Sequence, residues 1–593
     1  MTDTSKNLSQ MKKFMLAMVL FGIGLAASAK IQLPPQVGDY MVLQQQTGAR
    51  LWGWTDPGAQ VTATVSWSKQ KYSTRADGEG LFEFVVNTPA GSYTERTVTI
   101  KSGKESVTLE HVLIGEVWLG SGQSNMEMSL KGYDSCPVDG NYQEAMGAGK
   151  YTGRIRFSMI PRTEAYSPRR DSGGPWQECT PQNVLGFSAT GWFFAKALND
   201  VLDVPVGVIC NAWGGSSVEG WLPKEVCAGF PGCPADSASV RAVMNSMHRP
   251  TIMYYGQWTP VRRYTYRGVI WYQGETNVNV RPDTYAEHLE ILIDLLRAET
   301  GNPELPFYQV EIAPYAENSN PDGVECAKLR ELQQKAARET ENCWIVTTTD
   351  LMHEYEMWQI HPGNKKGVGD RLAWMALNHT YGMDFFPGIA PTYNSMDVDD
   401  NEVVLRFDNV RQAGGFNRFD HIEGFEICGA DQVWYPAEAR GQNMASTITV
   451  SSPDVPHPVA VRYAFRNWKP GNLAGANGQG VAPFRTDRIL EGETPFDPST
   501  APDSDFSGHW VGTVRQMGRE TSYDFTLKKL ADGNWSCEVP GQEPREARVR
   551  ANKATFNYPM MPGMEFPMTI RMRPDGTVWM ETMMGGTVDF TKK

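Results

Sequence analysis

A short turn at the end of an apolar run is the part of this sequence best suited to chemistry. The run from Val112 to Leu119 ends at Gly120-Ser-Gly-Gln-Ser124-Asn-Met-Glu-Met. Small residues permit a tight turn, and open α/β folds place reacting groups at such strand ends. Ser124 can present its Oγ to a crevice, beside a helix N-terminus that stabilises negative charge. The alternative is a Ser/Asn turn that only caps a helix.

Three later segments have the same form, an apolar strand followed by residues that can act on a substrate. Gly214 and Gly215 follow one strand, and paired glycines let a backbone N–H approach a substrate oxygen. Gln273, Glu275 and Asn277 follow another. A side-chain amide there can donate to an oxyanion, and the carboxylate can organise the pocket or hold a sugar hydroxyl. A plain glycine turn and a satisfied polar strand end are the alternatives.

His361 lies on a loop just ahead of an amphipathic helix at 369–377. An imidazole there is well placed as a general base, because its ordinary pKa lies near 6.5. A single histidine is more often structural. The serine, the glycine pair, the amide and the histidine follow one another along the chain in this order, each at a strand–helix junction. This joint arrangement indicates an active site much more specifically than any one of its members does.

The elements that must position these residues form a βαβ pattern. It predicts a largely parallel sheet with helices on both faces. Short β-strands are predicted before and after this region. The strands are expected at 112–119, 154–158, 206–210, 268–272, 306–312 and 343–348, and the helices at 191–202, 285–299, 327–339 and 365–377.

Composition divides the chain of 593 residues into several parts. Lys12-Lys13, an apolar run and Ala27-Ser-Ala29 predict a signal peptide, hence an exported protein, periplasmic or secreted after cleavage near Ala29. Residues 488–506 are rich in Pro, Asp, Ser and Thr and predict a linker. The expected parts are a signal peptide (1–29), an N-terminal β-sandwich domain (30–111), a catalytic domain (112–382), a β-rich domain expected to pack with the N-terminal one (383–487), the linker, and a small accessory β domain of unknown role (507–593).

Charge and cysteine content exclude several functions. The net charge is −13 without a basic cluster, which argues against nucleic acid or an anionic membrane as partner. No later segment is long and apolar enough to span a membrane. Nine cysteines in this length are not a disulfide framework. Cys227 and Cys233 either close a small loop or stay separate thiols, and no spacing indicates a metal site.

Together the four segments resemble the SGNH hydrolase superfamily, and within it the sialate O-acetylesterase family. The matching segments begin at Trp118, Trp213, Gly268 and Ile360, and the resemblance covers roughly residues 31–487. It implies a three-layer α/β core with a flavodoxin-like parallel sheet and flanking β-sandwich domains.

The resemblance also implies roles for the candidate residues. Ser124 would be the nucleophile and His361 the general base. The oxyanion would be held by the backbone N–H groups of Ser124 and Gly215 and by a side-chain amide, for which Gln273 is preferred. Glu275 and Asn277 are possible supporting residues. No metal or organic cofactor is implied.

Two departures from the superfamily pattern leave questions open. Gly274 is followed by Glu-Thr-Asn instead of the usual x-Asn-Asp, which puts Asn277 one residue late. Trp358 occupies the position where many members carry the aspartate that orients the histidine. The group that orients His361 is either an acid or a backbone carbonyl. The candidates are Asp350, Glu354, Glu356 and the carbonyl of Gln359.

The expected activity is ester hydrolysis through an acyl-enzyme, with O-acetylated sialic acid as substrate. An acetylated plant polysaccharide such as xylan or pectin is the alternative, and it would use the same catalytic residues. Trp213, Trp221 and Trp258 are candidates for sugar contact. A non-catalytic carbohydrate-binding protein is the alternative from another class, with the intact set of four segments against it. Oligomeric state is left open.

Overall fold

The computed structural model describes residues 30–593, except 418–420, 442–444, 488–502, 517–518, 551–552, 562–563, 573–575 and 582–586. The predicted signal peptide and most of the predicted linker lie outside the described residues. In the part that is described, no helix is long and apolar enough to cross a membrane. The chain forms two compact units. Unit 1 contains Met1–Ile312, Leu332–Leu351 and Gln359–Gly388, and unit 2 contains Ala313–Glu331, Met352–Trp358 and Ile389–Lys593.

Unit 1 begins with antiparallel β-structure. Burial alternates along β3, where Val61, Ala63 and Val65 are buried and the residues between them are exposed. This is the pattern of a strand with one buried face. β2 pairs with β5, and β3 pairs with β4 and β6. The strands are β1 (Val42–Gln44), β2 (Gly48–Trp54), β3 (Gln60–Val65), β4 (Lys71–Arg75), β5 (Leu81–Asn87) and β6 (Ser92–Ser102).

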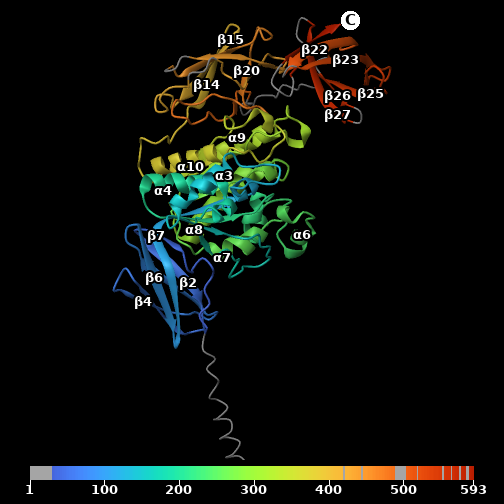
Figure 1. Cartoon of the computed structure of the whole chain (residues 1–593). Coiled ribbons are helices and arrows are strands. Elements are labelled where there is room, and N and C mark those ends of the chain that lie inside the picture. The colour runs from blue at the N-terminus through green and yellow to red at the C-terminus, as the bar shows by residue number, and fades with distance from the viewer. Residues whose placement is uncertain are drawn as a thin grey trace, which may run out of the picture. The chain divides into compact units, whose positions relative to one another are not determined.

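Strand β7 (Glu105–Gly122) belongs both to this β-structure and to the central sheet (Figure 1). Its first part pairs antiparallel with β6, and its last part pairs parallel with β10 (Val206–Ala212) and β11 (Gly268–Tyr272). The residues in the first part of β7 are partly buried, and those in the last part are all buried. The reason is that a central parallel strand is covered on both faces. His111, with φ of +55°, interrupts the extended backbone between the two parts. The strand therefore crosses the predicted domain boundary at 111/112.

The central sheet has the order β13-β12-β11-β7-β10-β8-β9. All neighbours are parallel except β8 and β9. Without the edge strands β8 and β9, the order is the doubly wound 2-1-3-4-5. The remaining strands are β8 (Ile155–Met159), β9 (Trp176–Glu178), β10 (Val206–Ala212), β11 (Gly268–Tyr272), β12 (Phe307–Val310) and β13 (Cys343–Val346).

The predicted helices are present, with ends within two residues of the expected ones. Ser188 Oγ accepts from Gly191 N–H and caps α4, and Asn364 Oδ1 accepts from Gly367 N–H and caps α10. The helices are α2 (Ser124–Glu127), α3 (Asn141–Gly147), α4 (Ala189–Leu202), α5 (Lys224–Cys227), α6 (Ser237–Ala242), α7 (Thr259–Val261), α8 (Tyr285–Thr300), α9 (Glu325–Glu339) and α10 (Lys365–His379).

Single helical turns connect several of these elements. Two of them, η3 and η6, follow the predicted glycine pair and Gln273. The 3₁₀ turns are η1 (Ala148–Tyr151), η2 (Asn183–Gly186), η3 (Val218–Trp221), η4 (Ser246–His248), η6 (Glu275–Val278), η7 (Pro282–Thr284), η8 (Glu317–Ser319) and η9 (Glu354–Glu356), and η5 (Tyr254–Trp258) is a π-helical turn.

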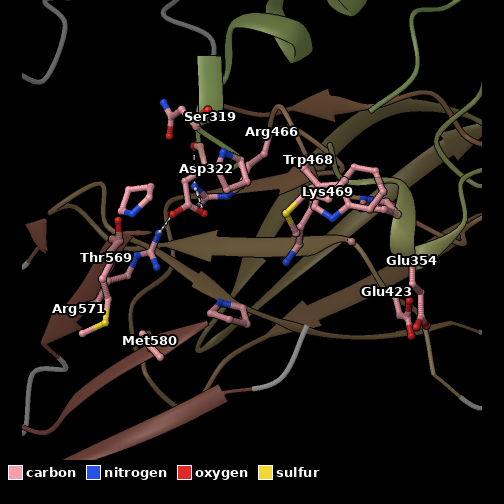
Figure 2. Close-up of a pocket in the computed structure, with 18 of the residues that line it drawn as sticks. Ser319, Asp322, Glu354, Glu423, Arg466, Trp468, Lys469, Thr569, Arg571 and Met580 are labelled. Atoms are coloured by element: carbon pink, nitrogen blue, oxygen red, sulfur yellow. Dashed lines mark hydrogen bonds and ion pairs between the residues drawn. The ribbon is translucent and has the colours of Figure 1, made fainter. Parts of the chain in front are cut away.

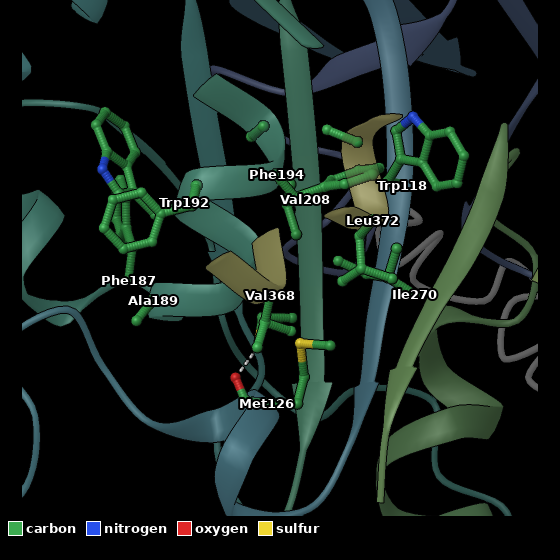
Figure 3. Close-up of a cluster of buried hydrophobic side chains, with 14 of the residues drawn as sticks. Trp118, Met126, Phe187, Ala189, Trp192, Phe194, Val208, Ile270, Val368 and Leu372 are labelled. Atoms are coloured by element: carbon green, nitrogen blue, oxygen red, sulfur yellow. Dashed lines mark hydrogen bonds between the residues drawn. The ribbon is translucent and has the colours of Figure 1, made fainter. Parts of the chain in front are cut away.

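The core of unit 1 holds the segments that carry Ser124 and His361. Helices α4 and α10 lie side by side over the sheet (Figure 1). Met126 is fully buried in this core together with Val368 of α10 and Val208 of β10 (Figure 3). Burial of a methionine side chain contributes about 1.5–3 kcal/mol. The same packing therefore fixes the turn after Ser124 and the helix after His361.

The nine cysteines are all thiols in this structure and all are buried. The thiols of Cys227 and Cys233 are hydrogen-bonded to each other, which lowers the pKa of Cys233. Both are separate thiols in this structure, which is one of the two predicted alternatives.

Unit 2 contains two four-stranded sheets around one core. Their orders are β14-β15-β19-β18 and β17-β16-β20-β21. Val403, Leu405, Ile427 and Val461 are fully buried in the core that they share. The strands are β14 (Thr392–Asp399), β15 (Glu402–Asp408), β16 (Phe425–Cys428), β17 (Trp434–Pro436), β18 (Glu438–Gly441), β19 (Thr447–Ser451), β20 (Ala460–Tyr463) and β21 (Phe484–Arg485). Packing of residues 383–487 with the N-terminal β domain stays a prediction.

The C-terminal part of unit 2 is a closed eight-stranded barrel. Phe525, Leu527 and Ile570 fill its interior. The turn at Asp532-Gly533 between β23 and β24 has Gly533 at φ +85°. The strands are β22 (Gly508–Gln516), β23 (Arg519–Lys529), β24 (Trp535–Glu538), β25 (Arg545–Arg550), β26 (Lys553–Met561), β27 (Met564–Met572), β28 (Val578–Glu581) and β29 (Thr587–Lys592).

Candidate active site

The turn between β7 and α2 is held tightly against the end of β11. Gly122 has φ of +131°, and a Cβ at this position would lie 2.2 Å from the Tyr272 carbonyl oxygen. The Gln123 N–H donates to the same carbonyl at 2.9 Å. Only glycine fits position 122, so the chain turns sharply and leaves Ser124, half-buried, as the first residue of α2.

The side chain of Gln123 strengthens this attachment. Its Oε1 accepts from the backbone N–H groups of Gly274 at 3.2 Å and Thr276 at 3.3 Å. Gln123 is 2% exposed. It lies within the predicted serine motif, yet the sequence indicated no role for it; the structure shows that it joins the ends of β7 and β11.

The loop after β10 passes directly beside Ser124. The Trp213 N–H donates to the Gly122 carbonyl at 3.0 Å. A Cβ on Gly214 would lie 3.2 Å from Ser124 Cβ. The predicted glycine pair and the predicted serine are therefore neighbours in space.

Two backbone donors near Ser124 are available for a ligand. Within the described residues, the backbone N–H groups of Ser124 and Gly215 make no hydrogen bond. The Gly214 N–H, in contrast, donates to the Glu127 carboxylate at 2.9 Å, and Glu127 is paired with Arg162. Ser124 and Gly215 are the residues from which the sequence predicted backbone oxyanion donors.

Asn125 joins the serine turn to the histidine loop. Its Nδ2 donates to Glu275 Oε1 at 2.5 Å and to the Ile360 carbonyl at 3.0 Å. Its Oδ1 accepts from Lys365 Nζ at 2.6 Å. Asn125 and Lys365 are fully buried and Glu275 is 7% exposed. Removing Asn125 would take one hydrogen-bond partner from each of two buried charged groups, so this network helps to hold the three segments together.

Glu275 is bound to Asn125 in this network, and its supporting role stays a prediction. Burial raises the pKa of its carboxyl, while the Asn125 hydrogen bond and the positive charge of Lys365 lower it. Its Oε2 has no hydrogen-bond partner among the described residues. The carboxylate thus lies in the network that orders the serine turn.

Tyr133 lies between Ser124 and His361. Its hydroxyl donates to the Ser124 carbonyl at 3.1 Å, and its ring meets the His361 ring edge to face at 4.8 Å between centroids. The backbone N–H of His361 donates to Gln359 Oε1 at 3.2 Å. Burial, and then the positive charge of Lys365, lower the pKa of His361 to about 4. The imidazole is therefore neutral at pH 7 and able to accept a proton.

A serine turn, two open backbone donors and a neutral histidine are thus assembled at the carboxyl end of one parallel sheet. The sequence pattern of the carbohydrate esterases described as sialic acid-specific acetylesterases matches residues 114–378. This stretch contains all of the candidate residues. The chain belongs to this family of carbohydrate esterases. The esterase is accordingly a carboxylic ester hydrolase.

Relatives of the esterase extend beyond this region. The sialate O-acetylesterase of Rattus norvegicus is 26% identical over 513 residues, covering 77% of this chain and 93% of the rat protein. That of Homo sapiens is 25% identical over 473 residues, covering 73% and 87%. A carbohydrate acetylesterase from Xanthomonas citri has a solved structure that matches with a TM-score of 0.68 at 30% identity, covering 78% of this chain and all of that one.

Gln273 and Asn277 are fully buried in the esterase and bound to each other. Gln273 Nε2 donates to the Ser216 carbonyl at 3.0 Å and to Asn277 Oδ1 at 2.8 Å. Asn277 Oδ1 also accepts from the Val218 N–H, and its Nδ2 donates to Glu219. Both N–H groups of Gln273 are therefore engaged. In this arrangement the amide supports the loop of Gly214 and Gly215 instead of facing an oxyanion.

Asp350 is bound to another partner in the esterase and does not orient His361 here. Its carboxylate forms an ion pair with Arg371 through two contacts. In one of them Arg371 Nη1 lies 2.7 Å from Asp350 Oδ1. Glu356 accepts from the His353 N–H at 2.9 Å. Within the described residues of unit 1, neither ring nitrogen of His361 has a hydrogen-bond partner. The described contact to the imidazole ring is the one with Tyr133.

The tryptophans expected to contact sugar do not present open ring faces. Trp221 is 3% exposed and donates to Ser216 Oγ, and Trp258 is 2% exposed and donates to Glu299. Trp213 is 8% exposed. That expectation is wrong for Trp221 and Trp258, because both rings pack inside the protein. Sequence alone does not distinguish a buried tryptophan from one on a surface.

We expect Gly215→Ala to lower kcat about 10²–10³-fold, the usual effect of losing one oxyanion donor. Gly215 has φ of +77°, and a Cβ there would lie 2.1 Å from Met247 Sδ. An alanine is strained at this left-handed position, and either the Met247 side chain or the loop must shift; a shift of the loop carries its N–H away from Ser124. Steady-state hydrolysis of a small acetyl ester measures the effect. Gly153→Ala is the matched control, because Gly153 has φ of +73° with open space around it. Equal kcat for the two variants would contradict the role of Gly215.

Proposed function

We propose that the esterase removes O-acetyl groups from sialic acid through an acyl-enzyme, with Ser124 as nucleophile and His361 as general base. The observation that carries the proposal is the attachment of both residues to shared neighbours. Asn125 binds the loop of His361, and Tyr133 contacts both Ser124 and His361. Two side chains held in this way keep a fixed geometry without waiting for the substrate.

Acylation begins when neutral His361 accepts the proton of Ser124 Oγ. The oxygen attacks the acetyl carbonyl carbon, and the carbonyl oxygen becomes an oxyanion. The N–H groups of Ser124 and Gly215 stabilise it. The protonated imidazole then gives its proton to the departing sugar oxygen, and the carbon–oxygen bond of the ester breaks. The deacetylated sugar leaves, and the acetyl group stays on Ser124.

Deacylation repeats the same steps with water. His361 takes a proton from water, whose oxygen attacks the acetyl carbon. A second oxyanion forms at the same two donors. Its collapse releases acetate and returns the proton to Ser124 Oγ. The chain's own groups supply every proton transfer in this scheme.

We expect Lys365→Met to move the acid limb of kcat/KM to higher pH. In the free enzyme this limb follows protonation of the general base, so it should lie near pH 4 in the unsubstituted protein. Removal of a neighbouring positive charge raises the pKa of His361, so activity at pH 5 falls relative to activity at pH 8. A pH profile measures the change. Lys366→Met is the control, because Lys366 is exposed on the same helix and pairs with Asp370. If the acid limb stays at the same pH in Lys365→Met, the assignment of His361 as the titrating base is contradicted.

The substrate is tested by acetate release from O-acetylated sialic acid and from acetylated xylan. The family and the rat and human relatives support sialic acid. Release from O-acetylated sialic acid at a much higher kcat/KM than from acetylated xylan is the expected result. A preference for xylan would keep the acyl-enzyme mechanism and replace the proposed substrate. No release from either would contradict the proposal.

A further inference from the structure

Glu127 ends α2 and takes no part in the proton transfers of the proposed mechanism. It follows Ser124 by three residues, so the two side chains are neighbours on this short helix. Its side chain is partly buried, with 22% of it exposed. Glu127 Oε2 accepts from the Gly214 N–H at 2.9 Å. The carboxylate therefore joins the helix of the proposed nucleophile to the loop after β10.

Arg162 holds the same carboxylate through two contacts. Its Nε donates to Glu127 Oε1 at 2.6 Å, and its Nη2 donates to Glu127 Oε2. Such a two-point contact between a guanidinium and a carboxylate fixes the direction of both groups. Arg162 follows β8, which pairs with β10 in the central sheet. The ion pair therefore connects the segments that follow three neighbouring strands, β7, β10 and β8.

Gly214 lies where these groups converge. A Cβ on Gly214 would lie 2.8 Å from Arg162 Nη2 and 2.9 Å from Glu127 Oε2. It would lie 3.2 Å from Ser124 Cβ. The ion pair and the proposed nucleophile are thus on the same side of this residue. The absence of a side chain at position 214 lets the charged groups approach the backbone this closely.

Gly214 and Gly215 are the two central residues of a four-residue turn. The Ser216 N–H donates to the Trp213 carbonyl at 3.1 Å. Gly215 has φ of +77°, as the third residue of a type II turn requires. The second residue has ψ of about −30° in type I turns and about +120° in type II turns, which reverses the peptide between the two central residues. That peptide carries the Gly215 N–H, so the direction of this donor depends on the conformation of Gly214.

The conformation of Gly214 is fixed by contacts, because glycine has no side chain that restricts it. Among the described residues, the Gly214 backbone makes one hydrogen bond, which runs from its N–H to Glu127. Without this acceptor the turn loses the contact that holds its second residue. The central peptide can then reverse and direct the Gly215 N–H away from Ser124.

The negative charge of Glu127 has to be compensated at this place. An oxyanion forms during the proposed reaction, and a second negative charge nearby opposes it. Arg162 supplies the opposite charge at both oxygens of the carboxylate. The hydrogen bond to Glu127 raises the pKa of Arg162, so the guanidinium stays charged. The pair can therefore hold the turn without adding net charge beside the reacting ester.

We propose that Glu127 is a positioning residue for the Gly215 oxyanion donor and that Arg162 compensates its charge. Glu127 holds the Gly214 N–H, and the turn fixed in this way directs the Gly215 N–H toward the carbonyl oxygen of the ester. This role rests on the proposed function, since that function assigns the Gly215 N–H to the oxyanion. Neither side chain exchanges a proton in the scheme.

Glu127→Gln should lower kcat for a small acetyl ester by about 10- to 10²-fold and change KM by less than about two-fold. Glutamine has the size of glutamate, but its NH₂ group would face the N–H groups of Arg162 or of Gly214. The lost donor acts on the oxyanion and not on the neutral ester, so the loss falls on kcat. Steady-state kinetics measures the two constants, and thermal unfolding measures the stability of the variant.

Two control variants lose a paired carboxylate elsewhere in the chain. Glu144 pairs with Lys196 at 2.6 Å, and its side chain is 19% exposed. Asp322 lies 3.5 Å from Arg466 and 3.6 Å from Arg571 in unit 2, and its side chain is 26% exposed (Figure 2). Glu144→Gln and Asp322→Asn should both keep the kcat of the unsubstituted protein, even where the unfolding temperature falls.

Arg162→Met tests the compensation of charge. It should lower kcat at least as much as Glu127→Gln, because it leaves the carboxylate unpaired beside the oxyanion. Adding Glu127→Gln to this variant removes the unpaired charge. The double variant should therefore have the kcat of Glu127→Gln alone, higher than that of Arg162→Met or equal to it. Two side chains with independent structural roles would instead multiply their losses.

Unchanged kcat in Glu127→Gln, an equal loss in Glu144→Gln, a loss confined to KM, or multiplied losses in the double variant would each overturn the proposal. Ser124→Ala, assayed beside these variants, separates such an outcome from failure of the proposed function. Loss of hydrolysis in Ser124→Ala with full activity in Glu127→Gln would reject the role of Glu127 and keep the nucleophile. Activity retained in Ser124→Ala would reject the proposed function itself.

Discussion

Ser124→Ala should lower kcat/KM for acetyl ester hydrolysis by about 10⁴-fold or more, because the other serine of this segment, Ser121, is buried and donates its hydroxyl hydrogen to the Asn211 carbonyl. The fold should be unchanged. Ser124 is half-buried at the start of α2, while the adjacent Asn125 and Met126 supply the buried contacts of this turn. Hydrolysis of a small acetyl ester and labelling by a fluorophosphonate probe measure the effect.

Ser106→Ala is the matched control for this substitution. Ser106 is exposed and lies on β7, the same strand that ends at the nucleophile turn. It should keep normal hydrolysis and probe labelling. Near-normal activity in Ser124→Ala, or labelling at another serine, would refute the proposed nucleophile. Complete absence of labelling in the unsubstituted protein would favour a carbohydrate-binding role.

His361→Gln should also lower kcat/KM by about 10⁴-fold, because Ser124 then has no base to accept its proton. Glutamine keeps a polar side chain of similar size next to Tyr133. The remaining rate should no longer show the acid limb near pH 4 that we assign to the imidazole. Single-turnover kinetics with a chromogenic ester would separate slow acylation from slow release of acetate.

His457→Gln serves as the control for loss of a histidine, because His457 is exposed in unit 2. It should behave like the unsubstituted protein. His361→Gly supplies a second measurement, since added imidazole should restore part of the activity if the missing group is a base. A His361→Gln protein that retains more than about a tenth of the activity would be incompatible with the mechanism.

Most of the architecture of the catalytic region was predictable from local patterns. The run from Val112 to Leu119 is apolar because parallel strands are covered on both faces. Ser188 and Asn364 are N-cap residues, and they mark the starts of α4 and α10. Alternation in β3 likewise predicts a half-buried strand. In each case the deciding interaction lies within a few residues in the sequence.

The position of one boundary was less predictable. The expected change of domain at 111/112 falls inside β7, which is continuous from Glu105 to Gly122. A change in hydrophobic pattern shows where burial changes, and it does not show whether the strand ends there. His111 adopts a left-handed backbone conformation at this place, and the residue type histidine does not predict that conformation.

For the site, sequence order indicated which strand ends carry chemistry but not how their side chains pair. Gln273 is an amide at the expected strand end, yet packing directs both of its N–H groups to Ser216 and Asn277. Trp221 and Trp258 have the right residue type for sugar contact and are buried instead. Residue type alone does not determine the orientation of a side chain.

By itself the sequence determined the family, the parallel sheet and the four segments that meet at its edge, because each is encoded in contiguous residues. Only the tertiary structure decided that Asn125 joins Glu275, Ile360 and Lys365, which follow it by 150, 235 and 240 positions. It also decided that Asp322 meets Arg466 and Arg571 in unit 2. Hydrogen bonds and ion pairs over such separations depend on how whole elements pack, and no local pattern contains that information.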